Sequence, residues 1–99
     1  MITETLLIPI TRFQGEFLDD LAMSGSESYG AALDAGVKVT QSGHTLVVPP
    51  AAFEALGLAI GIRADIASEG EYNIGERRSI LSLARKLADA GVSKAAPLP

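Results

Sequence analysis

The sequence contains no cysteine and no tryptophan, and it has a single histidine among its 99 residues. Without cysteine the chain can form no disulfide framework, no thiolate zinc site and no cysteine nucleophile. Three Phe and two Tyr are the whole aromatic content, so the core is expected to be aliphatic. The apolar runs are too short to span a membrane, and the N-terminus lacks the basic stretch of a signal peptide. We therefore expect a soluble cytoplasmic protein.

Length and charge limit the possible functions further. A chain of this length with 47% hydrophobic residues is expected to fold as one domain. The net charge of −4 is uneven, because residues 1–36 carry six acidic residues against Arg12 alone, whereas residues 75–94 carry five basic residues against two acidic ones. Nucleic-acid binding needs a basic face that neutralises phosphates. The net charge therefore disfavours a uniformly basic nucleic-acid binder, and only binding through a local basic face remains an alternative.

The first third of the chain predicts a strand followed by two helices. Residues 5–11 are typical of a strand, and Pro9 favours the edge of a sheet because it lacks a backbone donor. Residues 13–23 place apolar side chains at helical spacing, which predicts an amphipathic helix with an acidic outer face. A serine-rich turn at 24–28 then leads into a short helix that ends at Gly36.

The segment 37–58 gives the clearest indication of the fold. Residues 37–48 form two β-type runs around a glycine turn, which predicts a hairpin. Pro49 ends the second run, and the proline after it suits the first turn of a short helix over 50–57.

Residues 60–67 (IGIRADIA) alternate apolar and other side chains. This alternation predicts a strand with Ile60, Ile62 and Ile66 on one face. A turn and a short return strand over 72–74 are expected to follow.

The clearest helix is the last element. Asn73 and Glu76 have the spacing of a capping box, and apolar residues then recur at helical intervals, which predicts an amphipathic helix over 74–90. The tail at 94–99 is expected to fray. Together these elements predict a single α+β domain with a small mixed sheet.

One part of the chain resembles a known family. From Gly43 onward, GHTLVVPPAAFEALGLAIGIRADIASEGEYNI contains a glycine turn, an apolar strand ending at Pro49, a helix end at 55–58 and a predicted strand, turn and strand. In this order, residues 37–74 are similar to the AbrB and MazE type of swapped-hairpin DNA-binding domain. The resemblance implies a homodimer with interlocked hairpins that acts as a transcription regulator or an antitoxin. It also implies the nearest candidates for DNA contact, which are Lys38, His44 and Arg63.

The family places Arg and Lys on the first hairpin and the short helix. This chain offers only Lys38 and His44 there, so the DNA-binding surface of the family is incomplete.

No catalytic motif is present. His44 is interpreted as an exposed turn residue, because no recognised pattern places a nucleophile or a paired carboxylate beside it. The acidic residues Glu16, Asp19 and Asp20 lack further ligands at the loop spacing of a metal site. We therefore expect neither an enzyme nor a cofactor or metal.

Two functions remain open, both based on binding a macromolecule. The first is the dimeric AbrB-like regulator. The second is an acidic inhibitor or adaptor, of the sort that mobile elements encode, whose face of Glu16, Asp19 and Asp20 meets a basic protein. Basic residues of the last helix are further candidates for partner contact, namely Arg77, Arg78 and Arg85.

Overall fold

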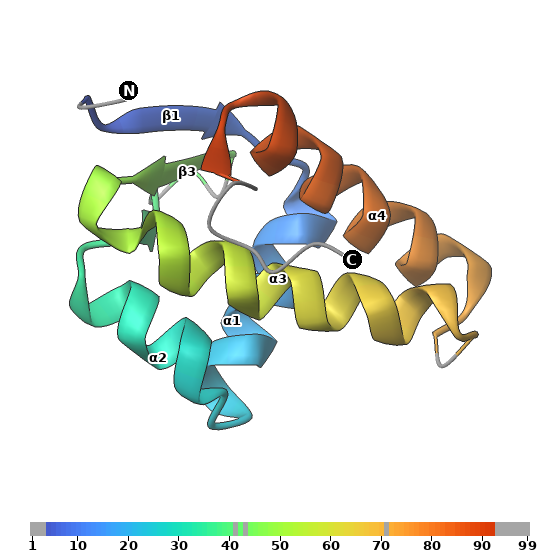
Figure 1. Cartoon of the computed structure of the whole chain (residues 1–99). Coiled ribbons are helices and arrows are strands. Elements are labelled where there is room, and N and C mark those ends of the chain that lie inside the picture. The colour runs from blue at the N-terminus through green and yellow to red at the C-terminus, as the bar shows by residue number, and fades with distance from the viewer. Residues whose placement is uncertain (1–3, 41, 43, 71, 93–99) are drawn as a thin grey trace.

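The computed structural model describes residues 4–40, 42, 44–70 and 72–92 (Figure 1). The predicted frayed tail at 94–99 lies outside the described residues. The elements follow the order β1 (Leu6–Pro9), α1 (Arg12–Met23), α2 (Glu27–Asp34), β2 (Lys38–Val39), β3 (Thr45–Val48), the 3-10 helix η1 (Pro50–Ala52), α3 (Phe53–Ser68) and α4 (Ile74–Asp89). Helices and a small sheet together confirm the α+β class.

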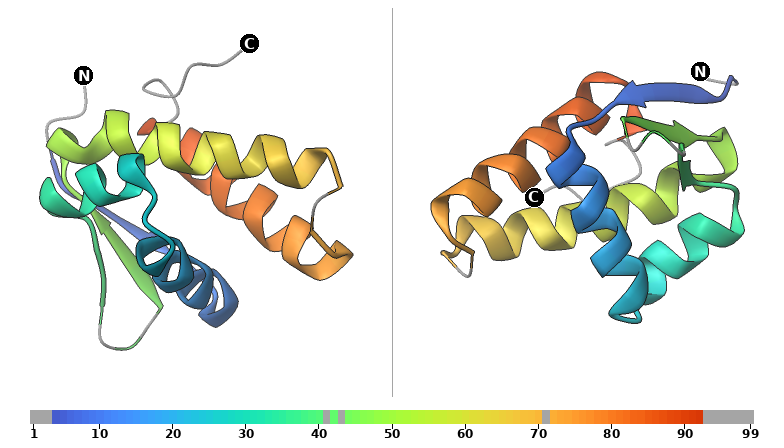
Figure 2. Two further views of the ribbon diagram at one scale, coloured as in Figure 1. Left: turned by 90° about the horizontal axis from the view of Figure 1, so that it is seen from below. Right: turned by 180° about the vertical axis from the view of Figure 1, so that it is seen from behind.

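The sheet has three antiparallel strands in the order β1-β3-β2. The predicted hairpin over 37–48 is confirmed, whereas the predicted mixed sheet is wrong because every described pairing is antiparallel. Side chains alternate across the sheet, so Ile8 and Leu46 are buried together while Leu7 and Lys38 are exposed on the other face. The helices pack on the buried face (Figure 2).

Three of the described helices begin with side-chain caps: Ser26 accepts a hydrogen bond from the backbone N–H of Tyr29 at the start of α2, and α1 and α4 begin with capping boxes. Asn73 accepts a hydrogen bond from the backbone N–H of Glu76, and the Glu76 carboxylate accepts one in return, so the predicted capping box of α4 is confirmed. Thr11 and Gln14 form a second capping box at the start of α1. Each box satisfies backbone donors that the first helical turn leaves free.

The predicted strand over 60–67 is wrong, because these residues belong to α3. The helix predicted over 50–57 instead continues from η1 to Ser68. The return strand predicted over 72–74 is also wrong, since Asn73 caps α4 and Ile74 begins it. The short apolar alternation of residues 60–67 is compatible with either a strand or a buried helix. α3 packs between α2 and α4, and this packing favours the helix.

The core lies where the sheet, α1 and α2 meet the α3–α4 hairpin. It is aliphatic, as predicted, except for Tyr29 on α2. None of the helices in the described ranges is long and apolar enough to cross a bilayer. The core includes Ile8, Leu18, Leu21, Leu46, Leu56, Ile60, Leu83 and Leu87.

Tyr29 should make the stability of the protein depend on pH in the alkaline range. Burial raises the pKa of its hydroxyl to about 12, and the negative charge of Asp19 adds to this rise. In the unfolded chain the same group titrates near pH 10. The native state therefore holds the proton more tightly, and this stabilisation is complete below about pH 10. It is lost as the pH rises from about 10 through about 12.

Urea unfolding between pH 9 and 12 measures this effect, with Tyr29→Phe as the matched control. The free energy of unfolding of the wild type should fall more steeply than that of Tyr29→Phe, because only the wild type has this group to titrate. Parallel curves would show that Tyr29 does not carry the dependence.

Candidate functional site

The acidic residues that were predicted to share one face of α1 lie on two sides of the helix. Arg12, Glu16 and Asp19 are spaced four and three residues apart, so they share a face, which looks toward the β2–β3 hairpin. Asp20 instead lies on the side that faces α3 and the start of α4. Asp19 therefore borders a hollow beside the hairpin, Asp20 borders hollows on the other side of α1, and Glu16 borders both sides.

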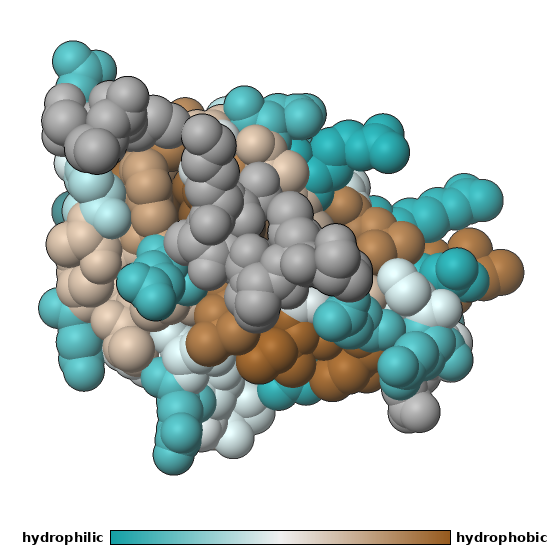
Figure 3. Space-filling view, viewed as in Figure 1, coloured by the Kyte–Doolittle hydropathy of each residue, from teal (hydrophilic) through white to brown (hydrophobic). Residues whose placement is uncertain are grey.

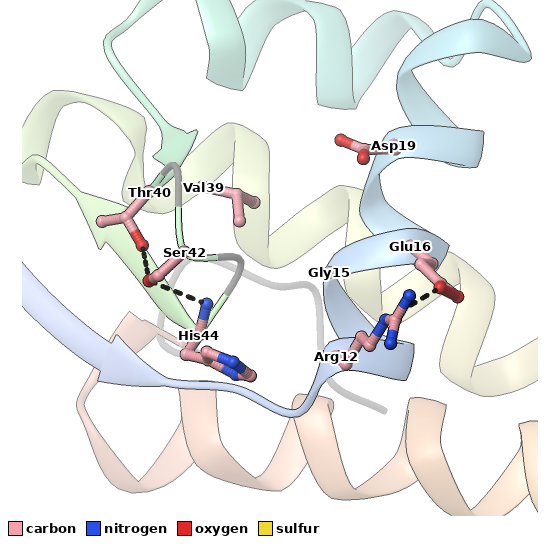
Figure 4. A pocket seen from close by; sticks show the side chains of 8 residues that line it. All are labelled: Arg12, Gly15, Glu16, Asp19, Val39, Thr40, Ser42 and His44. Carbon is pink, nitrogen blue, oxygen red and sulfur yellow. Dashed lines mark hydrogen bonds and ion pairs between the residues drawn. The ribbon is translucent and has the colours of Figure 1, made fainter.

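The first hollow is a groove of about 440 Å³ between α1 and the hairpin (Figure 4). Arg12 Nε lies 3.6 Å from Glu16 Oε1, and this exposed ion pair contributes little to stability. Asp19 extends from α1 toward the hairpin, and no ion pair of the described residues includes it. The opposite wall is formed by Val39, Thr40, Ser42 and His44.

The hairpin wall is polar but shows no catalytic arrangement. Thr40 Oγ1 and Ser42 Oγ share a hydrogen bond at 3.0 Å, and the backbone N–H of His44 donates to Ser42 Oγ at 3.4 Å. Over the described part of the chain, no hydrogen bond joins the imidazole of His44 to Ser42 or Asp19. A nucleophile oriented by a base, as acyl transfer requires, is therefore not assembled there.

On its other side, α1 borders two smaller hollows of about 160 and 170 Å³. Both are lined by Phe17, Asp20, Tyr72 and Glu76. Phe13, whose exposed fraction is 45%, extends this surface along α1. We call it the acidic aromatic surface, and it consists of Phe13, Glu16, Phe17, Asp20, Tyr72 and Glu76.

Arg63 lies at the border of this surface. Arg63 is a half-buried residue of α3, and its Nη1 donates a long, weak hydrogen bond of 3.5 Å to the Tyr72 hydroxyl. Arg63 lines one hollow together with the carboxylates of Asp20 and Glu76, while Glu16 is paired with Arg12. The surface therefore keeps an excess of negative charge next to three aromatic rings.

The structure does not bring the three predicted DNA-contact residues together. Lys38 is exposed on the outer face of the sheet, and His44 lies in the groove beside the hairpin. Arg63 is on the opposite side of α1 from His44. The predicted basic contacts of α4 are all exposed, namely Arg77, Arg78 and Arg85.

Sequence reasoning missed the aromatic part of the site. The spacing of Phe13 and Phe17 predicts a buried stripe, yet Phe13 has an exposed fraction of 45%. Glu76 was identified only as a capping residue, and Tyr72 only as part of a strand. The two phenylalanines one turn apart on an acidic helix were the available signal.

No protein-family model matches the chain, and neither a curated protein nor a solved structure matches it significantly. The described residues also contain no group of three or more His, Cys, Asp or Glu side chains placed to hold a metal ion.

Proposed function

We propose that this protein is a non-enzymatic binding protein, an inhibitor or adaptor that recognises a basic segment of a partner protein through α1. The observation that carries the proposal is the acidic aromatic surface, where Asp20 and Glu76 stand beside Phe17 and Tyr72. Aromatic rings and carboxylates together form an environment suited to the side chain of Lys or Arg.

Each half of such a side chain has a complement on this surface. The aliphatic stem can lie against Phe13 and Phe17, which removes apolar area from water. A cation over an aromatic ring gains about 0.5 to 2 kcal/mol, depending on how far it is desolvated. The carboxylates of Asp20 and Glu76 supply charge-assisted acceptors. The two hollows are of a size for single side chains rather than for a large ligand.

The charge of α1 favours a protein partner over DNA. Glu16, Asp19 and Asp20 would repel phosphates, whereas they would accelerate the encounter with a basic protein. The three candidates for the AbrB-like DNA binding predicted from residues 37–74, Lys38, His44 and Arg63, lie apart and do not form one continuous basic patch with each other. DNA binding stays a prediction, and an NMR titration with duplex DNA tests it.

The test is a titration followed by NMR, in which a lysine- and arginine-containing peptide is added to the labelled protein at low salt. We expect amide shifts at Asp20, Tyr72 and Glu76, and affinity that falls as salt rises because exposed charges are screened. Asp20→Lys should weaken binding about tenfold, since a like charge then faces the ligand.

Asp34→Lys is the matched control, because Asp34 is an exposed carboxylate on α2 that lines neither hollow. It makes the same charge change and should weaken binding much less. If both variants lost the same amount of peptide affinity, the loss would be an effect of net charge alone. That result would contradict a binding site on α1. Amide shifts at Lys38 and His44 on adding duplex DNA, without shifts for the peptide, would favour the AbrB-like alternative.

A further inference from the structure

Arg63 makes the two smaller hollows beside α1 unlike each other. Among the residues that the structure describes, one hollow is lined by Phe13 and by no basic side chain, whereas the other is lined by Arg63. We call them the Phe13 hollow and the Arg63 hollow. They adjoin each other, because both are lined by the same four residues, namely Phe17, Asp20, Tyr72 and Glu76.

The charges of the two linings decide which hollow takes a cation. Asp20 and Glu76 line both hollows, and Glu16, which borders the Phe13 hollow, is paired with Arg12. The Arg63 hollow has the same two carboxylates but adds a guanidinium. A cationic side chain therefore gains more in the Phe13 hollow, because no like charge faces it there.

Once a cation occupies the Phe13 hollow, the Arg63 hollow favours the opposite charge. The bound cation offsets Asp20 and Glu76, and the Arg63 guanidinium is left beside an opening of about 170 Å³. The hydrogen bond of this guanidinium to the Tyr72 hydroxyl is long, and no ion pair of the described residues includes Arg63. A guanidinium has five N–H donors, and a carboxylate can accept two of them side by side. The Arg63 hollow is therefore suited to an acidic side chain.

We propose that the protein recognises a base and an acid together, with a Lys or Arg of the partner in the Phe13 hollow and an Asp or Glu in the Arg63 hollow. Arg63 is then the residue that determines this specificity. The inference rests on the proposed function, because it names the ligand of the same surface more closely. In an extended segment, side chains two residues apart lie on one face and about 7 Å from each other, so adjoining hollows suit a base and an acid at that spacing. A segment with two bases at this spacing would place the second cation against Arg63.

The test compares capped peptides of sequence Gly-Lys-Ala-X-Gly, in which X is Glu, Gln or Lys, and the Glu and Gln peptides are also made in the reverse order. NMR titration of the labelled full chain gives each affinity. In the better of the two orders, we expect the Glu peptide to bind about threefold more tightly than the Lys peptide, an effect of the size that exposed ion pairs supply. The Gln peptide should lie between them. The net charge of −4 alone would give the opposite ranking, because it attracts the Lys peptide most strongly.

Substitutions of Arg63 test its role directly. Arg63→Gln removes the guanidinium and keeps a polar side chain, and it should reverse the ranking so that the Lys peptide binds most tightly. Arg63→Lys keeps the charge and should keep the ranking by a smaller margin, because an ammonium group lacks the two parallel donors of a guanidinium. Arg85→Gln is the matched control, since Arg85 is exposed on α4 and lines neither hollow. It makes the same charge change as Arg63→Gln and should keep the wild-type ranking.

Two outcomes separate this inference from the proposed function. If the Lys peptide binds the wild type most tightly and shifts the amides of Asp20 and Glu76, the proposed site stands and the preference for an acid is wrong. If no peptide shifts these amides at the highest soluble concentration, the proposed function fails and this inference fails with it.

Two further outcomes would also overturn the inference. An unchanged ranking in Arg63→Gln, with circular dichroism showing an intact fold, would mean that Arg63 does not determine the specificity. Apolar side chains gather over α3 (Figure 3), where Leu58 has an exposed fraction of 36%. Amide shifts centred on Leu58 would therefore show that the peptides bind through their apolar atoms alone.

Discussion

Ile60→Ala should lower the free energy of unfolding by about 2 to 5 kcal/mol, the range for truncating a buried aliphatic side chain. Ile60 is 1% exposed and lies in the core where α3 packs against α4. Ile62→Ala should change the same quantity by less than about 1 kcal/mol, because nearly half of that side chain is already exposed to water. The two residues are two positions apart, yet the helix turns them to different environments.

Urea denaturation measures both values, with the two variants at the same low protein concentration so that any self-association contributes equally. The comparison distinguishes the helix found in the structure from the strand that the sequence predicts for residues 60–67. In a strand Ile60 and Ile62 would share one buried face, and their truncations would cost similar amounts. Similar losses would therefore contradict the helical assignment of this segment.

The elements that were predicted correctly are those whose ends carry their own signals. Asn73 and Glu76 define the start of α4 by local hydrogen bonds, and the Pro pair at 49–50 ends the hairpin because proline cannot continue the ladder. These signals act over three or four residues and need no tertiary context. The hairpin and the last helix were predictable for this reason.

Residues 60–67 lacked such a signal. Apolar residues alternate with others in this segment, which is the pattern of a strand: Ile60, Ile62, Ala64 and Ile66 alternate with Gly61, Arg63 and Asp65. In a helix, the same sequence places apolar side chains on every side. Nothing local favours one reading. The contacts of α3 with α2 and α4 settle the question, and they join segments that are distant in sequence.

The candidate site was predictable only in part, for a related reason. The acidic character of α1 is a local property, and the exposure of Glu16, Asp19 and Asp20 follows from their helical spacing. The neighbours of Asp20 are not local, since Tyr72 and Glu76 reach it across the fold. Sequence periodicity indicates the face on which a residue lies, but not the residues that lie beside it.

Gln14→Leu should destabilise the protein by about 3 kcal/mol, although glutamine and leucine are similar in size. Gln14 is the buried polar residue that joins α1 to α4. Its Nε2 donates to the Ser79 carbonyl at 2.9 Å, and its Oε1 accepts from the backbone N–H of Thr11 at 3.0 Å and from Lys86 Nζ at 2.8 Å. The substitution leaves a half-buried ammonium group without its acceptor, and unsatisfied partners of this kind cost about 1 to 3 kcal/mol each.

The double variant Gln14→Leu/Lys86→Met tests whether the orphaned charge is the cause. If it is, removing Lys86 as well should recover more than about 1 kcal/mol of the loss, because replacing both partners by apolar groups is nearly neutral. Lys86→Met alone should be mild, since Gln14 Oε1 still accepts from Thr11. Chemical denaturation of the three variants completes a double-mutant cycle, in which strong coupling is expected. Additive losses would show instead that Gln14 and Lys86 act independently, and that the packing of α1 on α4 does not depend on their hydrogen bond.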